Sequence, residues 1–240
     1  MNQLFRFFLV AFFALGVWSC VTTAPTGKQT EPQEPIEKVF IATNLSDSSV
    51  VSFLGITIFE NKRTYIADYD FSLNHFVKTQ VDSTLISKGL TTIVSENPLP
   101  EETMRGLRSG SRSVRVTTAK SLHSIGADAM LLIEQGQART GLNYNHGYLL
   151  PDHGLFLVRT IAGRRDFVKV PIIIRYYDLR TGEMIRRVVF DDDQMAESLT
   201  NFNHITEADH LKEADRAALT EAYKTKVDSL LRFAFQQLQF

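Results

Sequence analysis

The sequence predicts an α/β fold, with α+β as the alternative: a mixed sheet with helices packed on it, in a single domain. Short apolar runs typical of strands alternate with segments of helical periodicity, and a late pair of strands around a tight turn is expected to be antiparallel. Hydrophobic residues make up 44% of the 240 residues and charged residues 22%. This composition suits a buried core and excludes a coiled coil or a disordered chain. At roughly 100–200 residues per domain, we expect one domain with appendages.

The first half of the body is expected to begin with strands and to continue into a helix. Residues 38–45 form a short apolar run typical of a strand, and 49–70 holds two β-rich runs that suit a hairpin. The clearest helix is predicted at 72–89, because a serine at its start can cap the first turn and a glycine can end it. Residues 90–96 predict a further strand. The apolar residues of the helix recur at every fourth position as Leu73, Val77, Val81 and Leu85.

The second half predicts more strands and a long final helix. Residues 101–113 are polar, and 113–126 predicts a second helix. A strand predicted at 165–179 places five apolar side chains on one face, since side chains alternate along a strand. These five are Val168, Val170, Ile172, Ile174 and Tyr176. The other predicted elements are strands at 127–138, 155–160 and 184–190, a turn at 180–183, and a C-terminal helix with a stripe of Leu219, Ala222, Val227, Leu230, Leu231, Ala234 and Leu238.

The amino terminus, residues 1–19, predicts a signal peptide. Arg6 is the only charged side chain before an apolar run of twelve residues, 7–18. As a helix this run would span about 18 Å, short of the roughly 30 Å of a hydrocarbon core. An export signal therefore fits better than a permanent membrane span.

The stretch Val17-Trp18-Ser19-Cys20 resembles the lipobox of bacterial lipoproteins, which has an aliphatic residue three before the cysteine and a small residue directly before it. Val17 and Ser19 match this pattern, whereas Trp18 departs from it. The resemblance implies diacylglycerol on the Cys20 sulfur, cleavage before Cys20 and a membrane anchor of acyl chains such as palmitate. Cys20 is the only cysteine, so it cannot form an internal disulfide. The alternative is an ordinary signal peptide or signal anchor with an incidental cysteine.

Residues 20–37 predict a flexible tether, because they are rich in proline and poor in large apolar groups. A periplasmic domain is then expected at 38–240. Val21 follows the cysteine where enteric-type bacteria place an aspartate to retain lipoproteins in the inner membrane. We therefore expect a lipid-anchored protein of the bacterial cell envelope, in the outer membrane and facing the periplasm.

The charges and histidines exclude several function classes. Lys and Arg number 26 against 27 Asp and Glu, so no nucleic-acid partner is predicted. No cofactor and no metal are predicted, because the six histidines form no H-E-x-x-H pattern and the lone cysteine no C-x-x-C. Three aspartates in 190–194 are interpreted as the charged start of a helix rather than a calcium site. The basic stretch "GLRSGSR" at 106–112 is interpreted as an exposed loop rather than an anion site.

A tyrosine-rich loop predicts an interaction surface for a protein partner, since tyrosines often anchor such contacts. The alternative is that this loop folds back over the sheet. A catalytic alternative would need clustered Asp, His and Ser, with His146, Asp152 and His153 as the candidates. The predicted interaction surface consists of Tyr144, Tyr148, Leu149, Leu150 and Phe156.

Four stretches of the body resemble elements of a group of bacterial envelope proteins: "FLGITIFENKRTYI", "NHFVKTQVDSTLISKGLTTIVSE", "SIGADAMLLIEQGQA" and "IRYYDLRTGEMI". The group includes uncharacterised lipoproteins, the curli-secretion channel lipoprotein, the penicillin-binding-protein activator lipoprotein and the amino-terminal domain of the Tol-Pal β-propeller protein. The resemblance implies a fold rather than a chemistry, with strand-start and turn roles for Asp128, Asp178, Thr181 and Gly182.

The function expected from these observations is a non-catalytic binding or scaffolding role at the membrane, with a protein partner in the envelope. The protein is thus not expected to be an enzyme. The alternatives are a hydrolase that acts on envelope material and a subunit of a secretion or export assembly.

Overall fold

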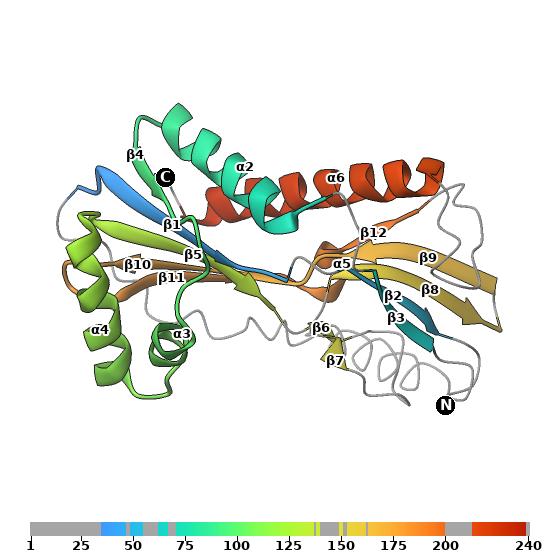
Figure 1. Cartoon of the computed structure of the whole chain (residues 1–240), viewed down its shortest axis with the longest axis horizontal. Helices are drawn as coiled ribbons and strands as arrows, with labels where there is room; N and C mark the ends of the chain where they lie inside the picture. The colour runs from blue at the N-terminus through green and yellow to red at the C-terminus, as the bar shows by residue number, and fades with distance from the viewer. Residues whose placement is uncertain are drawn as a thin grey trace, which may run out of the picture.

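The computed structural model describes residues 35–46, 49–54, 62–66, 71–136, 138–139, 149–150, 153–161, 163–199 and 213–238. Within these residues the chain forms two five-stranded mixed sheets, a two-stranded ribbon and five α-helices. The two larger sheets lie end to end, and the helices pack on them in layers (Figure 1). The predicted mixed α/β architecture in one domain is confirmed.

Sheet A has parallel strands at its centre and an antiparallel hairpin at one side. Strand β1 pairs in parallel with β4 and β5, and β10 runs antiparallel to both β5 and β11. In spatial order the strands of sheet A are β11 (Met184–Val189), β10 (Ile172–Asp178), β5 (Ala129–Gln135), β1 (Lys38–Asn44) and β4 (Thr91–Val94).

Sheet B is mostly antiparallel, with one parallel pair between β8 and β2. In spatial order its strands are β12 (Ala196–Ser198), β9 (Gly163–Lys169), β8 (Gly154–Thr160), β2 (Ser49–Leu54) and β3 (Lys62–Ile66). The two-stranded ribbon consists of β6 (Ala138–Arg139), at the end of the strand predicted at 127–138, and β7 (Leu149–Leu150), in the tyrosine-rich segment predicted as a loop.

Helices cover both faces of sheet A. Helix α2 (Leu73–Ser87) lies on one face beside α6 (Glu213–Leu238), and α3 (Glu101–Leu107) and α4 (Arg112–Ser121) lie on the other (Figure 1). The predicted start of α2 is confirmed, because the Ser72 hydroxyl accepts a hydrogen bond from the His75 backbone N–H at 3.2 Å.

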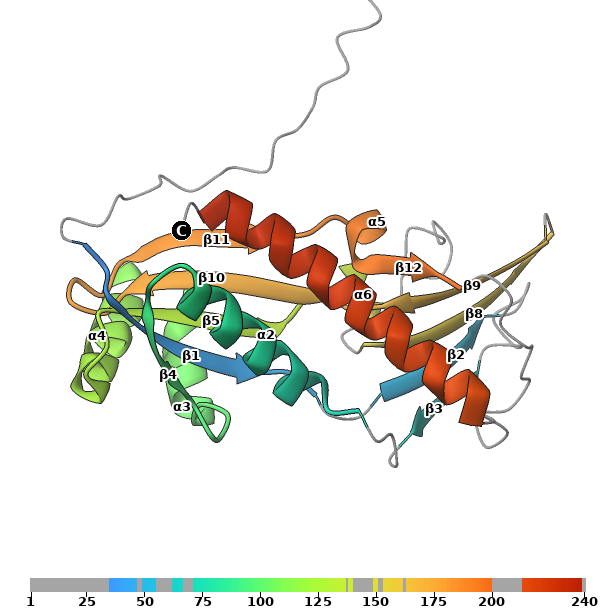
Figure 2. The ribbon, with the colours of Figure 1, turned by 90° about the horizontal axis from the view of Figure 1, so that it is seen from above.

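Helix α6 spans both sheets. It runs from sheet B across the junction to sheet A, with α2 beside its carboxyl-terminal half (Figure 2). One apolar cluster follows α6 and contains side chains from both sheets, which makes the two sheets one folded unit. Every predicted stripe residue of α6 is buried except Ala222, which is half-buried.

The polar segment 101–113 contains a helix that is not predicted from the sequence, since α3 begins at Glu101. Pro100 fixes the backbone just before the first turn, and the acidic Glu101 and Glu102 favour the positive end of the helix dipole. Met104 and Leu107 lie one turn apart and are both buried beneath α4. This short apolar pair is too brief a pattern to stand out in the sequence.

The strand predicted at 165–179 is in fact two strands, β9 in sheet B and β10 in sheet A. Pro171 lies between them and has no N–H to donate, so the chain changes partners there. Val170 donates to the Met195 carbonyl at 2.9 Å, and the Pro171 carbonyl accepts from Gly136 at 2.8 Å. The predicted alternation nevertheless continues through the break, since all five apolar side chains of the predicted face lie in one core cluster.

The residues to which the resemblance assigns strand-start and turn roles lie at such positions in the structure. The Asp128 carboxylate accepts from the backbone N–H of Lys38 at 2.9 Å, at the start of β1. The Asp178 carboxylate accepts from the backbone N–H of Arg180 at 2.9 Å and of Thr181 at 3.2 Å, in the turn between β10 and β11. Gly182 completes this turn with a φ of 76°, which favours glycine.

Candidate functional site: an arginine cluster at the edge of sheet A

The candidate site is built around Glu134, a buried carboxylate near the end of β5. Its side chain is 2% exposed, and two arginines contact it. Arg108, directly after α3, donates from Nε to Oε2 at 2.9 Å, and Arg175 of β10 pairs with Oε1 through Nη1. A carboxylate removed from water requires such compensation, because an unpaired buried charge is strongly destabilising.

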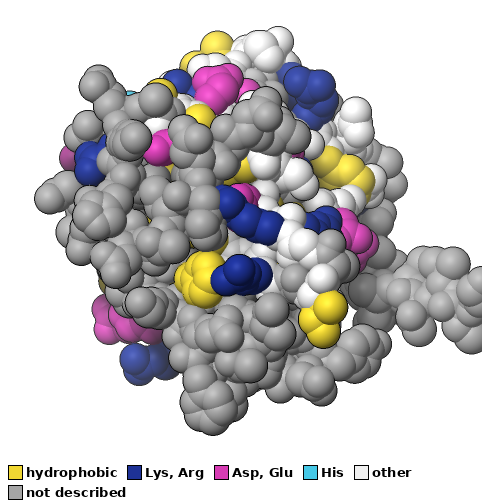
Figure 3. Space-filling model, turned by 90° about the vertical axis from the view of Figure 1, so that its right-hand side faces the viewer, with side chains coloured by type: hydrophobic (Ala, Val, Ile, Leu, Met, Phe, Trp, Pro, Cys, Tyr) yellow, Lys and Arg dark blue, Asp and Glu magenta, His cyan; other side chains and the backbone are white. Residues whose placement is uncertain are grey.

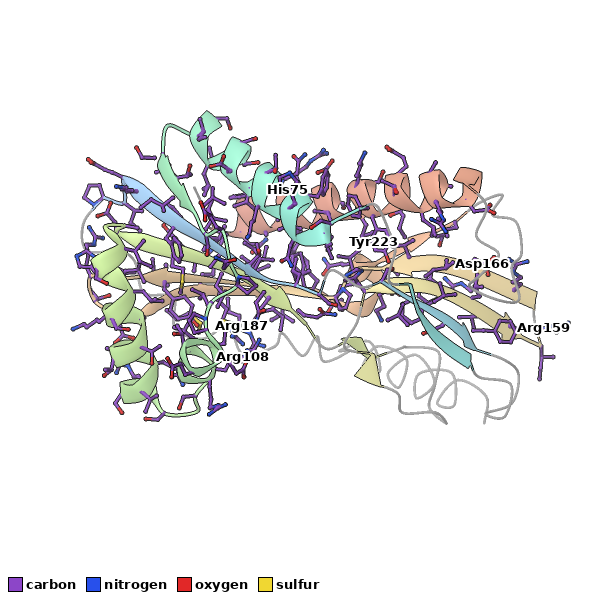
Figure 4. The ribbon with its side chains drawn as sticks, in the orientation of Figure 1. His75, Arg108, Arg159, Asp166, Arg187 and Tyr223 are labelled. Atoms are coloured by element: carbon purple, nitrogen blue, oxygen red, sulfur yellow. The ribbon has the colours of Figure 1, made fainter. Side chains whose placement is uncertain are left out.

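A third guanidinium adjoins this pair. The register of β10 and β11 places Arg187 directly opposite Arg175, so the two side chains share a face. Arg187 is exposed, and it makes no hydrogen bond or ion pair with the residues that the structure describes. Like charges directly opposite each other in a ladder are destabilising. Arg108 and Arg187 both lie on the α3 side of sheet A (Figure 4).

The cluster has a net positive charge and is open to solvent. The set holds three guanidinium groups and one carboxylate, of which Arg108 and Arg175 contact the carboxylate and Arg187 adjoins Arg175. Two positive charges are therefore uncompensated within the set. Arg175 is 14% exposed and Arg108 41%, so the charge rises from a buried base to the surface. Guanidinium forks match carboxylate and phosphate oxygens in geometry, which makes this cluster a candidate site for an anionic group.

An apolar side chain lies beside the cluster. Val189 follows Arg187 by two residues along β11, so it shares the same face, and it is 54% exposed. Strand β11 is an edge strand of the described sheet, with β10 as its one strand neighbour there. The site therefore offers positive charge, an apolar contact and a strand edge within a few residues.

Tyr177 forms the inner border of the site. Its hydroxyl donates to the Leu107 carbonyl at 3.4 Å, and its ring lies in the apolar cluster under α3 and α4. Burial raises the pKa of Tyr177, while Arg175 and Arg115 oppose this and Glu134 adds to it. The hydroxyl therefore stays protonated and anchors α3 to the sheet beside Arg108.

The stretch interpreted as an exposed loop, 106–112, is fastened at several points. Arg108 pairs with Glu134, and Arg112 pairs with Glu183 at 2.6 Å. Arg115 donates to the backbone carbonyl of Gly110 at 3.0 Å. The contact between Arg108 and Glu134 had one signal in the sequence: Glu134 lies near the end of a predicted strand that is otherwise apolar, and a buried carboxylate needs a cation.

Most of the predicted interaction surface lies outside the described residues. This applies to Tyr144 and Tyr148, and for Leu149 and Leu150 the structure describes only the backbone, in β7. Phe156 is a core residue that is 1% exposed, and its ring stacks on Phe167 with centroids 5.4 Å apart. Phe156 thus does not contribute to a surface, and the remaining four residues stay a prediction.

Of the three residues named for a hydrolase, the structure describes His153. His146, Asp152 and the lipidation candidate Cys20 lie outside the described residues. His153 is buried at the junction of the sheets, where its Nε2 lies 2.6 Å from the Ser46 carbonyl. A carbonyl can only accept, so Nε2 donates there, and Nδ1 of the neutral ring can accept from the Tyr223 hydroxyl at 3.5 Å.

Two further predictions concern metal sites. Asp191 caps the short helix α5 (Asp192–Met195), and the Gln194 side chain accepts from the Asp191 backbone N–H at 2.8 Å. This confirms the interpretation of the three aspartates as the start of a helix. In the part of the chain that the structure describes, no group of three or more His, Cys, Asp or Glu could hold a metal ion.

A polar groove of about 540 Å³ separates α2 from α6. Leu231 and Phe235 form its apolar floor, and Asp228 lies at its side. Burial raises the pKa of Asp228, with Arg232 opposing the shift and Glu221 adding to it. The charged lining residues are Lys88, Arg232 and Asp228, so both signs are present and the groove presents no single class of ligand chemistry. Its other lining residues are Gln80, Thr84 and Gln236.

No family model matches the chain, and the search of curated proteins likewise finds no match. Similar solved structures include lipoprotein GNA1162 from Neisseria meningitidis, at 12% identity and a TM-score of 0.31 over 80% of this chain and 98% of that one. Protein XCC0632 from Xanthomonas campestris, of family-model DUF330, is 10% identical at a TM-score of 0.39 over 87% and 91% of the two chains. The hypothetical protein CT253 from Chlamydia trachomatis is 10% identical at a TM-score of 0.41 over 83% and 96%.

These scores are too low to carry an argument about function. A lipoprotein is among the three structures, whereas the curli-secretion, penicillin-binding-protein activator and Tol-Pal propeller proteins are not. Among the described residues, no helix has both the length and the apolar character that are needed to cross a bilayer.

Proposed function

We propose that this protein is a lipid-anchored protein of the bacterial cell envelope that binds an acidic segment of a protein partner. The binding role is non-catalytic, and the anchor is the acylated Cys20 of the lipobox-like stretch. The anchor places the body at the outer membrane, facing the periplasm. The observation that carries the binding role is a cluster of three arginines with one carboxylate: Arg108 and Arg175 pair with the buried Glu134, and Arg187 lies opposite Arg175.

The geometry favours a carboxylate-bearing partner in an extended conformation. A carboxylate between Arg175 and Arg187 would relieve the repulsion of two like charges that face each other across the strands. Val189 would contact an apolar side chain two positions away from that carboxylate, because alternate residues of an extended chain share a face. The outer edge of β11 can accept such a segment as an added strand.

Site-specific photo-crosslinking in intact cells tests the binding role. A photoreactive residue at position 189 is expected to give an adduct, and mass spectrometry should locate the crosslink in an acidic, extended segment. The matched control is the same photoreactive residue at position 114, since Val114 is a valine on α4 that is also exposed. Arg187→Glu should abolish the adduct at position 189, whereas the extent of crosslinking at position 114 should be the same with and without Arg187→Glu. Adducts at position 189 that survive Arg187→Glu, or that map to non-acidic segments, would contradict the proposal.

A separate experiment tests the anchor. Cys20→Ala is expected to abolish incorporation of radiolabelled palmitate and to leave unprocessed precursor, because the thioether cannot form. Sucrose-gradient separation of the membranes then shows whether the wild-type protein is in the outer membrane. Equal palmitate labelling of wild type and Cys20→Ala would refute the lipoprotein assignment without affecting the crosslinking result.

A further inference from the structure

The hairpin of β8 and β9 ends in an unusually exposed apolar side chain. The last pair of its ladder joins Thr160 to Gly163, and Ile161 lies in the turn directly after Thr160. Ile161 is 94% exposed, whereas the other exposed large hydrophobic residues of the described chain range from 39% to 55%. Exposure of this degree leaves almost the whole side chain in water.

Three arginines surround this apolar tip. Arg159, Arg164 and Arg165 are all exposed, and Arg159 lies directly opposite Arg164 in the ladder. Arg164 pairs with Asp166 through Nε at 3.0 Å, whereas Arg159 and Arg165 make no ion pair or hydrogen bond with any residue that the structure describes. Three arginines and one aspartate leave two positive charges at the tip. Figure 3 views this end of the molecule and shows Lys and Arg side chains gathered next to hydrophobic ones.

The two strands that carry the tip are fixed by their pairing and by side-chain packing. Seven residue pairs join β8 to β9, and the stacked rings of Phe156 and Phe167 fix the two strands on one face. On the other face, Leu155, Leu157 and Val168 belong to the main core. The tip therefore needs no rearrangement to meet a surface, and the cost of ordering it on binding is small.

We propose that this tip is a second membrane contact, in which Ile161 enters the interfacial region of an anionic bilayer and the arginines lie among its headgroups. An apolar side chain ringed by arginines is the composition of interfacial segments, since the arginine stems cover apolar surface while the guanidinium groups reach anionic lipids. A bilayer surface fits better than a protein pocket because the convex tip projects from one end of the molecule (Figure 1).

The length of the tether allows one membrane to hold both contacts. Strand β1 begins at the opposite end of the molecule from the hairpin tip (Figures 1 and 2). The tether, residues 20–37, has eighteen residues and can reach about 60 Å when fully extended. For comparison, α6 has 26 residues and is about 39 Å long. The body can therefore lie along the membrane that holds its anchor.

The test uses the full-length lipidated protein in vesicles of 70% phosphatidylcholine and 30% phosphatidylglycerol. Ile161→Cys labelled with an environment-sensitive fluorophore is expected to show a blue shift and strong quenching by a lipid-borne quencher. Cys20 carries the lipid in the proposed mature protein, so the new thiol is the only one to react. Reaction of the fluorophore with the wild-type protein would instead show that the Cys20 thiol is free, which would contradict the lipid anchor without testing the hairpin tip. The matched control is Ser83→Cys, an exposed position on α2.

The charges provide a second readout. Each arginine replaced is expected to lower the ratio of inserted to free tip about fivefold, so Arg159→Gln with Arg165→Gln should lower it about 25-fold. Pure phosphatidylcholine or high salt should have a similar effect. With native Ile161 retained, hydrogen exchange of the hairpin should slow on anionic vesicles, and Ile161→Asp should remove that protection. A probe at position 161 that stays as accessible to water as the probe at position 83, or protection that Ile161→Asp leaves intact, would overturn the proposal.

Discussion

Tyr223→Phe should measure how strongly α6 holds the two sheets together. Tyr223 points from α6 toward the junction (Figure 4), where its hydroxyl lies 2.7 Å from the Ser49 hydroxyl and 3.5 Å from His153 Nδ1. Because His153 Nε2 donates to the Ser46 carbonyl, the chain of donors runs from Ser49 through Tyr223 to His153. One hydroxyl thus joins β2, α6 and the residue that precedes β8.

The expected loss of stability follows from what the substitution leaves behind. Phenylalanine keeps the ring, which contacts His153 at a centroid distance of 5.5 Å and Phe71 at 5.8 Å. The Ser49 hydroxyl stays buried and loses its partner, which costs about 1–3 kcal/mol. We expect a loss of about 2 kcal/mol in the free energy of unfolding, or a fall in Tm of about 4–8 °C for a body of this size.

The assay is urea unfolding followed by far-ultraviolet circular dichroism, with a double-mutant cycle as the control. Ser49→Ala removes the same hydrogen bond from the other side and leaves the aromatic contacts intact. The double mutant should then lose less than the sum of the two single mutants, with a coupling of about 1 kcal/mol. A loss below about 0.5 kcal/mol for Tyr223→Phe, or strictly additive effects, would refute the reasoning that this hydroxyl holds the junction.

Three further substitutions test the fold around the candidate site and the groove. Gly182→Ala should lower stability by at least about 1–2 kcal/mol in the same assay, because the φ of 76° disfavours a Cβ and the added carbon would overlap the Val116 carbonyl. Glu134→Ala should cost about 3 kcal/mol, since two guanidinium groups lose their counter-charge, and added sulfate should restore part of the loss. Asp228→Asn should gain stability relative to wild type as pH rises from 3 to 7. Burial raises the folded pKa of Asp228 above its unfolded value, so the contribution of the carboxyl is full below the unfolded pKa and is lost as pH rises through the folded one. A difference between Asp228→Asn and wild type that stays constant with pH would contradict this cause.

The elements with a long repeated pattern could be predicted from the sequence. Helix α2 has four apolar residues at a spacing of four and a serine cap, and the structure buries all four. The prediction that alternate apolar side chains of 165–179 face the core is also confirmed, although these side chains belong to two strands. Local periodicity determines which side of an element faces the core, and burial then follows.

The partners across the sheets could not be predicted in the same way. Nothing near Pro171 tells which strands β9 and β10 will pair with, because the pairing depends on residues far away along the chain. The arginine cluster has the same origin, since Arg108, Glu134 and Arg187 come from three separate elements. Sequence reasoning singled out Arg108 within a basic stretch but had no means to place it beside a carboxylate on a central strand.

The position of the arginine cluster follows from the unequal lengths of the layers on sheet A. Strand β10 has seven residues and is about 23 Å long, whereas α3, also of seven residues, is about 10 Å long. Helices α3 and α4 thus cover the half of the face that holds Met130, Leu132 and Tyr177, and that half is apolar. The other half, toward Pro171, has no helix of the described chain above it, so its side chains must tolerate water. Arg187 and Arg108, both exposed, meet that demand above the buried pair of Glu134 and Arg175, and their exposure makes them accessible to a partner.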